Sequence, residues 1–294
     1  MLITEDPFWF ECEGEQLVAI IHKPKQASRR GVMIIVGGPQ YRVGSHRQFI
    51  LLARALAKAG ISVMRFDYRG MGDSQGSRRT FYQIEKDIKI AIDEFFKHEQ
   101  TLKELVILGL CDAVSASLLY AYKDPRITGL VLLNPWIRTE ESMVKTYIKH
   151  YYLARLLDRA TWKGIANGQY NLVAAVTSFL NMFSKMLLNW NSGKQLNKQS
   201  NEYNEKTQNS NMALPEKMYD GLKRFTGHTL FILSGNDLTA AEFKDLVKGS
   251  PKWQSLLENA NTTKHELLEA NHTFSKREWR DQVATWTIKW IKTW

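Results

Sequence analysis

The sequence has few of the features that mark several classes of protein. Its 294 residues include only two cysteines, Cys12 and Cys111. Two thiols so far apart form neither a disulfide framework nor a CxxC pair for a structural metal, which suits a reducing compartment. No apolar run reaches the ~18 residues of a spanning helix, and the opening MLITEDPFWFECEGE is acidic where a signal peptide is basic. We expect a cytoplasmic globular protein that needs no cofactor or metal.

The positive charge of the chain is unevenly distributed. The formal net charge is +10, and residues 138–224 hold 13 Lys or Arg against 7 Asp or Glu. No zinc-finger spacing, RNP-like aromatic motif or basic-region helix accompanies this charge, so we expect no nucleic-acid partner. The basic segment favours instead an acidic substrate or peripheral contact with an anionic membrane.

Short apolar runs and amphipathic segments alternate along most of the chain. Residues 7–24 alternate in polarity and turn near Glu13-Gly14, as an antiparallel hairpin does. Runs typical of strands buried on both faces follow at 31–38, 61–67, 104–110, 127–135 and 229–235. Helical spacing of apolar residues occurs at 46–59, 81–97 and 112–122. The pattern predicts an α/β fold, a mostly parallel sheet with helices on both faces.

The alternation is interrupted once, after Trp136. Helical stretches there lead into the polar tract NSGKQLNKQSNEYNEKTQNSN. We predict a core of residues 1–137 and 224–294, and a helical cap at 138–223 with a mobile polar segment near 191–213. The apolar helical face of the cap either packs on the core or captures an acyl-bearing substrate.

A candidate nucleophile follows the run at 104–110. Gly109-Leu-Cys111-Asp-Ala113 has the form of a nucleophile elbow, in which small flanking residues allow a tight turn from strand to helix. The helix N-terminus favours a thiolate at Cys111, whereas the charge of Asp112 opposes it. Ser115, the alternative nucleophile, lies beyond the turn and is expected to pack on the helix.

Asp237 and His272 complete a catalytic set at two later strand ends. They follow the runs at 229–235 and 264–270, which gives the chain order nucleophile, acid, base of the α/β hydrolases. In such a set His accepts the thiol proton, Asp orients the imidazole, and the thiolate of Cys111 attacks an acyl carbon. Each residue alone is compatible with helix capping, but their joint placement predicts a triad.

The loop GGPQYRVGSHRQF at 37–49 is the candidate oxyanion loop. It lacks the G-K-[ST] of a phosphate loop, so nucleotide binding is not expected. Proline has no N–H, so the N–H of Gln40 replaces that of Pro39 as the predicted oxyanion donor, with the Asp112 N–H as its partner. Arg42 is either a contact for a substrate carboxylate or phosphate, or a solvated arginine.

Several segments resemble the α/β-hydrolase superfamily. DYRGMGDSQG at 67–76 is similar to its D-x-R-G-x-G-x-S loop, while Gly235-Asn-Asp237 and Asn271-His272-Thr-Phe resemble its acid and histidine loops. The likeness spans nearly the whole chain outside the insertion and implies the α/β-hydrolase fold. With the cysteine elbow, the 37–49 loop more narrowly resembles the exosortase A system-associated hydrolase 1 family, which accompanies exopolysaccharide and surface-protein export. Serine is commoner than cysteine at the superfamily's elbow.

Together these features predict a hydrolase that acts on a small-molecule ester or thioester through an acyl-Cys111 intermediate. An acyltransferase with the same triad shares the first half-reaction and remains an alternative. The second alternative is a binding protein that keeps the fold without catalysis.

Overall fold

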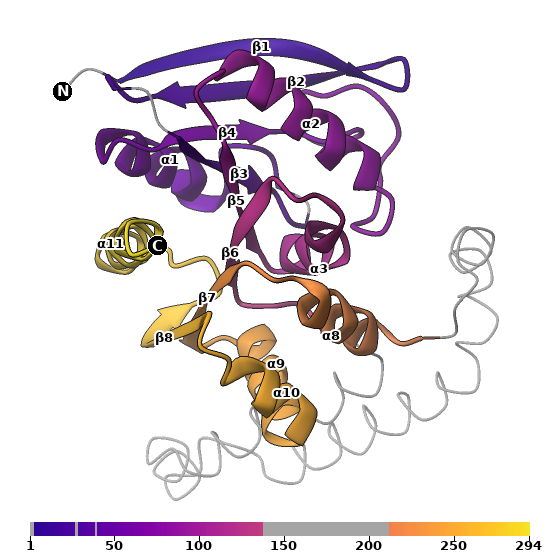
Figure 1. Ribbon diagram of the computed structural model, residues 1–294, viewed down its shortest axis with the longest axis vertical. Helices are drawn as coiled ribbons and strands as arrows, with labels where there is room; N and C mark the ends of the chain where they lie inside the picture. Colours follow the sequence, from indigo (N-terminus) through magenta and orange to yellow (C-terminus); the bar gives the residue numbers. More distant parts are fainter. Residues whose placement is uncertain (1–2, 27–28, 39, 138–211) are drawn as a thin grey trace, which may run out of the picture. The chain divides into compact units, whose positions relative to one another are not determined.

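The computed structural model describes residues 3–26, 29–38, 40–137 and 212–294 (Figure 1). Apart from Met212, these residues belong to one compact unit. The predicted cap as far as residue 211, with most of its polar segment, lies outside the described residues. Its structure therefore stays a prediction.

The described unit is built on one eight-stranded sheet of order β1-β2-β4-β3-β5-β6-β7-β8. Neighbours from β4 to β8 are parallel, while the pairs β1–β2 and β2–β4 are antiparallel. The mostly parallel sheet is thus confirmed. The strands are β1 (Thr4–Cys12), β2 (Glu15–Lys23), β3 (Arg30–Ile35), β4 (Ser62–Phe66), β5 (Glu104–Leu110), β6 (Ile127–Leu133), β7 (His228–Asn236) and β8 (Thr262–Asn271).

The antiparallel edge begins with the predicted hairpin. Strands β1 and β2 pair from Thr4 with Lys23 to Cys12 with Glu15. The two turn residues, Glu13 and Gly14, have φ of 52° and 81°. Two left-handed residues suit a two-residue hairpin turn, because their twist matches that of the flanking strands.

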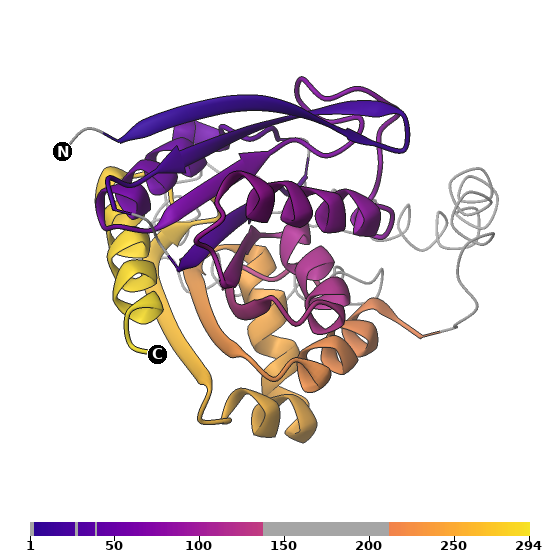
Figure 2. The same cartoon turned by 45° about the horizontal axis from the view of Figure 1, so that its top comes forward.

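Helices cover both faces of the sheet (Figures 1 and 2). Helices α1 and α11 pack on one face, and α2, α3, α8, α9 and α10 pack on the other. In the described part of the chain, no helix has the length and apolar character needed to cross a bilayer. The helices are α1 (Gln48–Lys58), α2 (Glu85–His98), α3 (Asp112–Tyr120), α8 (Leu214–Arg224), α9 (Leu238–Lys248), α10 (Pro251–Leu257) and α11 (Arg277–Ile291).

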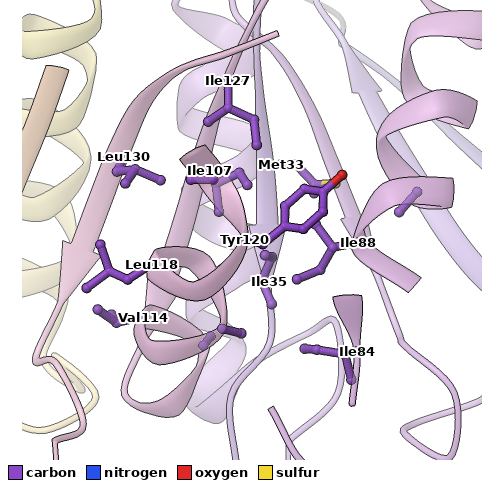
Figure 3. Packing of buried hydrophobic residues seen from close by; sticks show 14 of the residues in the cluster. Met33, Ile35, Ile84, Ile88, Ile107, Val114, Leu118, Tyr120, Ile127 and Leu130 are labelled. Atoms are coloured by element: carbon purple, nitrogen blue, oxygen red, sulfur yellow. The ribbon is translucent and has the colours of Figure 1, made fainter. Parts of the chain in front are cut away.

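The central strands alternate between two separate apolar cores. In β3, Met33 and Ile35 face the core under α2 and α3, whereas Val32 and Ile34 face the core under α1. Figure 3 shows α3 side chains, Leu118 among them, directed at the strands of the first core. Because alternate residues enter different cores, both sets are apolar, which explains the continuous runs in the sequence.

Two helices begin later than the apolar spacing predicts. Helix α1 starts at Gln48 because His46 and Arg47 have φ of 52° and 61°, outside the helical region. Helix α2 starts at Glu85, after a turn in which the N–H of Gln83 donates to the carbonyl of Thr80 at 2.8 Å. Residues 81–84 are apolar enough to extend the pattern, yet they form that turn.

Helix α8 comes from the end of the predicted cap and belongs to the same unit as the sheet. It packs on α3, where Gly221 lies so close that a Cβ would overlap the carbonyl oxygen of Leu118. The core unit therefore resumes at Ala213, before the predicted boundary at 223.

At Gly221, packing and helix propensity predict opposite effects of a Gly→Ala substitution on the stability of the fold. Propensity alone makes Gly→Ala stabilising by about 1 kcal/mol in a helix. We expect Gly221→Ala to destabilise the fold by about 2 kcal/mol, because α8 must move away from α3. Urea unfolding measures the difference. Gly249→Ala is the matched control, since its Cβ would meet no heavy atom closer than 3.3 Å; equal effects at the two sites would contradict the packing argument.

Candidate active site

The order of the strands places the candidate site at a topological switch point. From β3 the chain passes through α1 to β4 on one side, and then through α2 to β5 on the other. The loops that follow β3 and β5 therefore leave toward opposite faces of the sheet, which opens a crevice at their carboxyl ends. Gly38 lies in the first of these loops and Cys111 in the second.

The backbone at Cys111 has the geometry of a nucleophile elbow. Its φ and ψ are 65° and −125°, a region that costs a non-glycine residue about 1–3 kcal/mol. Its N–H donates to the carbonyl of Leu133 at 3.0 Å, and its carbonyl accepts the N–H of Trp136 at 3.2 Å. A Cβ on Gly109 would lie 2.9 Å from the Ala113 carbonyl, so the small residues make the turn possible.

The structure brings Cys111, His272 and Asp237 together. The Nδ1 atom of His272 lies 2.9 Å from Oδ2 of Asp237, and the imidazole interacts electrostatically with Cys111. Asp237 is in addition the N-cap of α9, where its carboxylate accepts the N–H groups of Thr239 and Ala240 at 3.2 and 3.1 Å. Because Nδ1 faces Asp237, Nε2 is the nitrogen left for the thiol.

His272 is strongly basic in this setting. Burial opposes its protonation, but the hydrogen bonds with Asp237 and Cys111 and the charges of both groups outweigh burial and raise the pKa of His272 to about 10. An ordinary histidine has a pKa of about 6.5. The imidazole therefore carries a proton through the neutral range.

A buried amide that the sequence analysis missed fixes the histidine loop. Asn134 follows β6, and its Nδ2 donates to the main-chain carbonyl of His272 and to Oγ of Ser234, both at 2.9 Å. Its Oδ1 accepts the N–H of Ser234 at 2.8 Å, and Ser234 Oγ donates to the carbonyl of Asn271. The ends of β6, β7 and β8 are thus linked. The only sequence signal was an Asn-Pro pair, which also marks ordinary turns.

In the loop after β3, the backbone N–H of Gly38 makes a hydrogen bond to the elbow. It donates to Oδ1 of Asp112 at 2.6 Å, beside the start of α3. For Gln40, the predicted donor, the structure records a side-chain contact instead, since its Oε1 accepts the N–H of Ser45 at 3.1 Å. The structure therefore brings the N–H of Gly38, just before Pro39, to the start of α3, and the role of the Gln40 N–H as an oxyanion donor stays a prediction.

Arg42 is held by two carboxylates of its own chain. Its guanidinium pairs with Asp67 and, at 2.7 Å, with Asp73, and its N–H donates to Asp67 at 2.6 Å. Both ends of the planar fork therefore have partners. This geometry favours a bracing role over the predicted substrate contact, which keeps no geometric support.

The residues of the 67–76 segment brace their loop. Asp67 is fully buried and accepts the N–H of Asp73 at 3.1 Å. Arg69, 2% exposed, pairs with buried Asp87 through two hydrogen bonds of 2.9 and 2.8 Å. Burial raises the pKa of Asp67, although the donors around it work in the opposite direction.

The competing nucleophiles are buried. The hydroxyl of Ser115 donates to the carbonyl of Trp136 at 2.6 Å, so it packs on the helix as expected. Cys12 is fully buried, and burial raises its pKa to about 11. Among the described residues, no three His, Cys, Asp or Glu side chains gather as metal ligands do.

Residues 27–188, more than half of the chain, match the family described as Serine aminopeptidase, S33. The chain belongs to that family. The family name refers to a serine, whereas the elbow of this chain carries Cys111. No curated protein sequence is significantly similar to the chain. The narrower resemblance to exosortase-associated hydrolases stays a prediction.

Solved structures of α/β hydrolases share the fold. An esterase of Pyrococcus furiosus has 14% identity and a TM-score of 0.64, over 99% of this chain and 93% of that one. Est1E of Butyrivibrio proteoclasticus, solved with ferulic acid, has 13% identity and a TM-score of 0.57, over 97% and 99%. The mouse alpha/beta hydrolase domain-containing protein 10 has 13% identity and a TM-score of 0.57, over 97% and 98%. The α/β-hydrolase fold expected from the sequence is confirmed.

The Asn134 network predicts a joint loss of stability and reactivity. In Asn134→Ala, the buried N–H of Ser234 and the carbonyl of His272 lose their partner, which we expect to destabilise the fold by about 3 kcal/mol. Urea unfolding measures this loss. The rate of Cys111 alkylation by iodoacetamide in the folded variant should also fall, because His272 is no longer held. Asn261→Ala at an exposed turn is the control; a loss of stability with normal alkylation would limit Asn134 to a structural role.

The basicity of His272 predicts a pH-dependent difference in thiol reactivity. With a folded pKa of about 10, its imidazolium faces Cys111 at neutral pH and disappears as the pH rises through that value. We expect His272→Ala to slow alkylation of Cys111 about tenfold or more at pH 7, where a thiol alone is a few per cent ionised. The two rates should converge near pH 10. His265→Ala, whose ring stacks on Trp286, is the control; equal rates at pH 7 would disprove the coupling.

Proposed function

We propose that the protein hydrolyses an ester or thioester through an acyl-Cys111 intermediate. The observation that carries this proposal is the position of His272, which pairs with Asp237 at 2.9 Å through Nδ1 and interacts electrostatically with the elbow cysteine. Membership of a hydrolase family and the α/β-hydrolase fold support it. The esterases among the similar structures act on acyl bonds of the same chemical kind.

The proposed reactive form of the site is a pair of Cys111 thiolate and His272 imidazolium. In it the thiol proton has passed to Nε2 of His272, and the contact of Nδ1 with Asp237 stabilises the imidazolium. Sγ bonds to the acyl carbon, and the carbonyl electron pair moves to oxygen. As the bond to the leaving oxygen or sulfur breaks, Nε2 of His272 gives that atom its proton.

Water completes the turnover in the second half-reaction. It attacks the acyl-Cys111 carbon while neutral His272 takes one of its protons. The tetrahedral centre then collapses with release of the acid and of Cys111 as thiolate. Asp237 keeps Nε2 aimed at the reacting atoms throughout, because its carboxylate is itself fixed by two backbone N–H groups of α9.

A pocket beside the oxyanion loop is the proposed place for part of the substrate. It has a volume of about 590 Å³ and is lined by residues of two loops, Gln40 and Tyr41 on one side and the 70–78 segment on the other. Its lining includes the carboxylate of Asp73, which pairs with Arg42, and the guanidinium of Arg78, which we propose as the contact for an anionic group of the substrate. This assigns to Arg78 the contact that the sequence analysis predicted for Arg42.

The same residues can support acyl transfer. If an alcohol or amine enters in place of water, the acyl group passes to that acceptor, and the ratio of acid to acylated acceptor separates the two activities. From its resemblance to the exosortase-associated hydrolases, we propose that the activity serves exopolysaccharide or surface-protein export.

Intact-mass measurement tests the nucleophile. After exposure to a panel of acyl thioesters and p-nitrophenyl esters, the wild-type protein should gain the mass of one acyl group. Cys111→Ala should gain none while remaining folded, and Cys111→Ser should keep weak esterase activity, since a hydroxyl needs His272 to take its proton during attack. Cys12→Ala is the matched control and should keep the adduct, because that thiol is buried. Wild-type turnover in Cys111→Ala would refute the proposal.

A further inference from the structure

The carboxyl group of Asp112 lies where an acyl oxyanion would bind. Asp112 follows Cys111 and is the first residue of α3. Its Oδ1 accepts the N–H of Gly38 at 2.6 Å, across the crevice from the elbow. The backbone N–H groups of residues 112 and 113, at the start of the helix, lie near enough to this carboxyl group to work against the rise of its pKa.

These donors are the ones that an oxyanion site in this fold requires. The backbone N–H after the nucleophile and one N–H of the loop after β3 converge on the oxygen that becomes charged when the nucleophile attacks. In this chain they are the N–H groups of Asp112 and Gly38. The N–H of Gly38 already donates to a carboxyl oxygen, so one of the two donors is engaged before any substrate arrives.

The oxyanion loop is shaped to admit this carboxyl group. A Cβ on Gly37 would overlap Oδ1 of Asp112 and the carbonyl oxygen of Leu110, so only glycine leaves room for the contact. Burial raises the pKa of Asp112, although the backbone donors and the charge of His272 partly offset that effect. The carboxyl group is therefore enclosed on two sides by main chain.

We propose that Asp112 is a specificity-determining residue, which fills the oxyanion site with its own carboxyl group and must be displaced before Cys111 can be acylated. This inference rests on the acyl-Cys111 chemistry proposed above. Displacement has to be driven by contacts that a substrate makes elsewhere. Small esters, which offer few such contacts, are therefore poor substrates, and esters or thioesters that also fill the neighbouring pocket are preferred.

A purely structural role for Asp112 predicts the opposite result. An acidic residue in the first turn of a helix stabilises that helix, so its removal would weaken the helix and give the oxyanion no additional donor. Removal of an occupant instead frees the N–H of Gly38 for the transition state. A single oxyanion donor changes acyl-transfer rates about 100-fold in enzymes of this kind, so the freed site should give a large effect.

Two reagents separate the oxyanion site from the general reactivity of the thiol. Acylation of Cys111 by p-nitrophenyl acetate passes through an oxyanion, whereas alkylation by iodoacetamide does not. Loss of the negative charge beside the thiol affects both rates, so the informative quantity is the ratio of the acylation rate to the alkylation rate. Intact mass gives both rates for each protein.

We expect Asp112→Ala to raise this ratio about tenfold or more. Asp112→Asn should raise it less, because an amide oxygen still accepts the same N–H groups but more weakly. It also serves as the second variant if Asp112→Ala fails to fold. Glu266→Gln on β8 removes one negative charge at a side chain paired with Lys244, and should leave the ratio unchanged.

An unchanged or lower ratio in folded Asp112 variants that still acylate would overturn this proposal alone. If neither the wild-type protein nor any variant is acylated while alkylation is normal, the proposed function falls, and this proposal falls with it. If Glu266→Gln raises the ratio as much as the Asp112 variants do, the effect comes from net charge alone, and the proposal is overturned.

Discussion

The left-handed turn at Cys111 is the constraint on which the candidate site depends. With φ of 65° and ψ of −125°, the chain reverses from β5 into α3 within one residue, which leaves the thiol half-buried at the end of the sheet. The turn is held from both ends by backbone hydrogen bonds to Leu133 and Trp136, which lie at and just beyond the end of β6. Because β3 and β5 flank a switch point, the same turn brings the start of α3 against the loop after β3.

Hydrogen bonds across three strand ends then fix the acid and the base relative to that turn. Asp237 accepts two N–H groups of α9 and still presents Oδ2 to His272. The main chain of His272 is held by Asn134, whose amide belongs to the segment after β6, close to the contacts that hold the elbow. A displacement of the β6 end would therefore move the nucleophile and the base together, which keeps their separation constant.

The sequence was sufficient for the sheet, the tight turn at Cys111 and the pairing of Asp237 with His272, because each depends on local pattern or on chain order. Continuous apolar runs mark strands with a core on each side, and Gly109 with Ala113 marks a tight turn. The partners of Arg42 were not predictable in this way, since Asp67 is 25 residues away and meets it only through the fold. The choice between Gly38 and Gln40 depends on the direction of a single N–H in a loop, for which no periodicity exists.

The proposed occupation of the oxyanion site by Asp112 also bears on why a cysteine stands in a family named for serine. A serine is un-ionised until attack, so its deprotonation and the growth of the oxyanion occur together, and an oxyanion site blocked by a carboxylate would raise the barrier to both. A thiol ionises far more readily than a hydroxyl, so a cysteine nucleophile can lose its proton before the substrate binds. Asp237 pairs with His272 and favours its protonated form, and the charge of His272 in turn works against the rise of the pKa of Asp112. In this arrangement Asp112 opposes the oxyanion while it favours the imidazolium, so a thiolate nucleophile tolerates its presence where an alcohol would not.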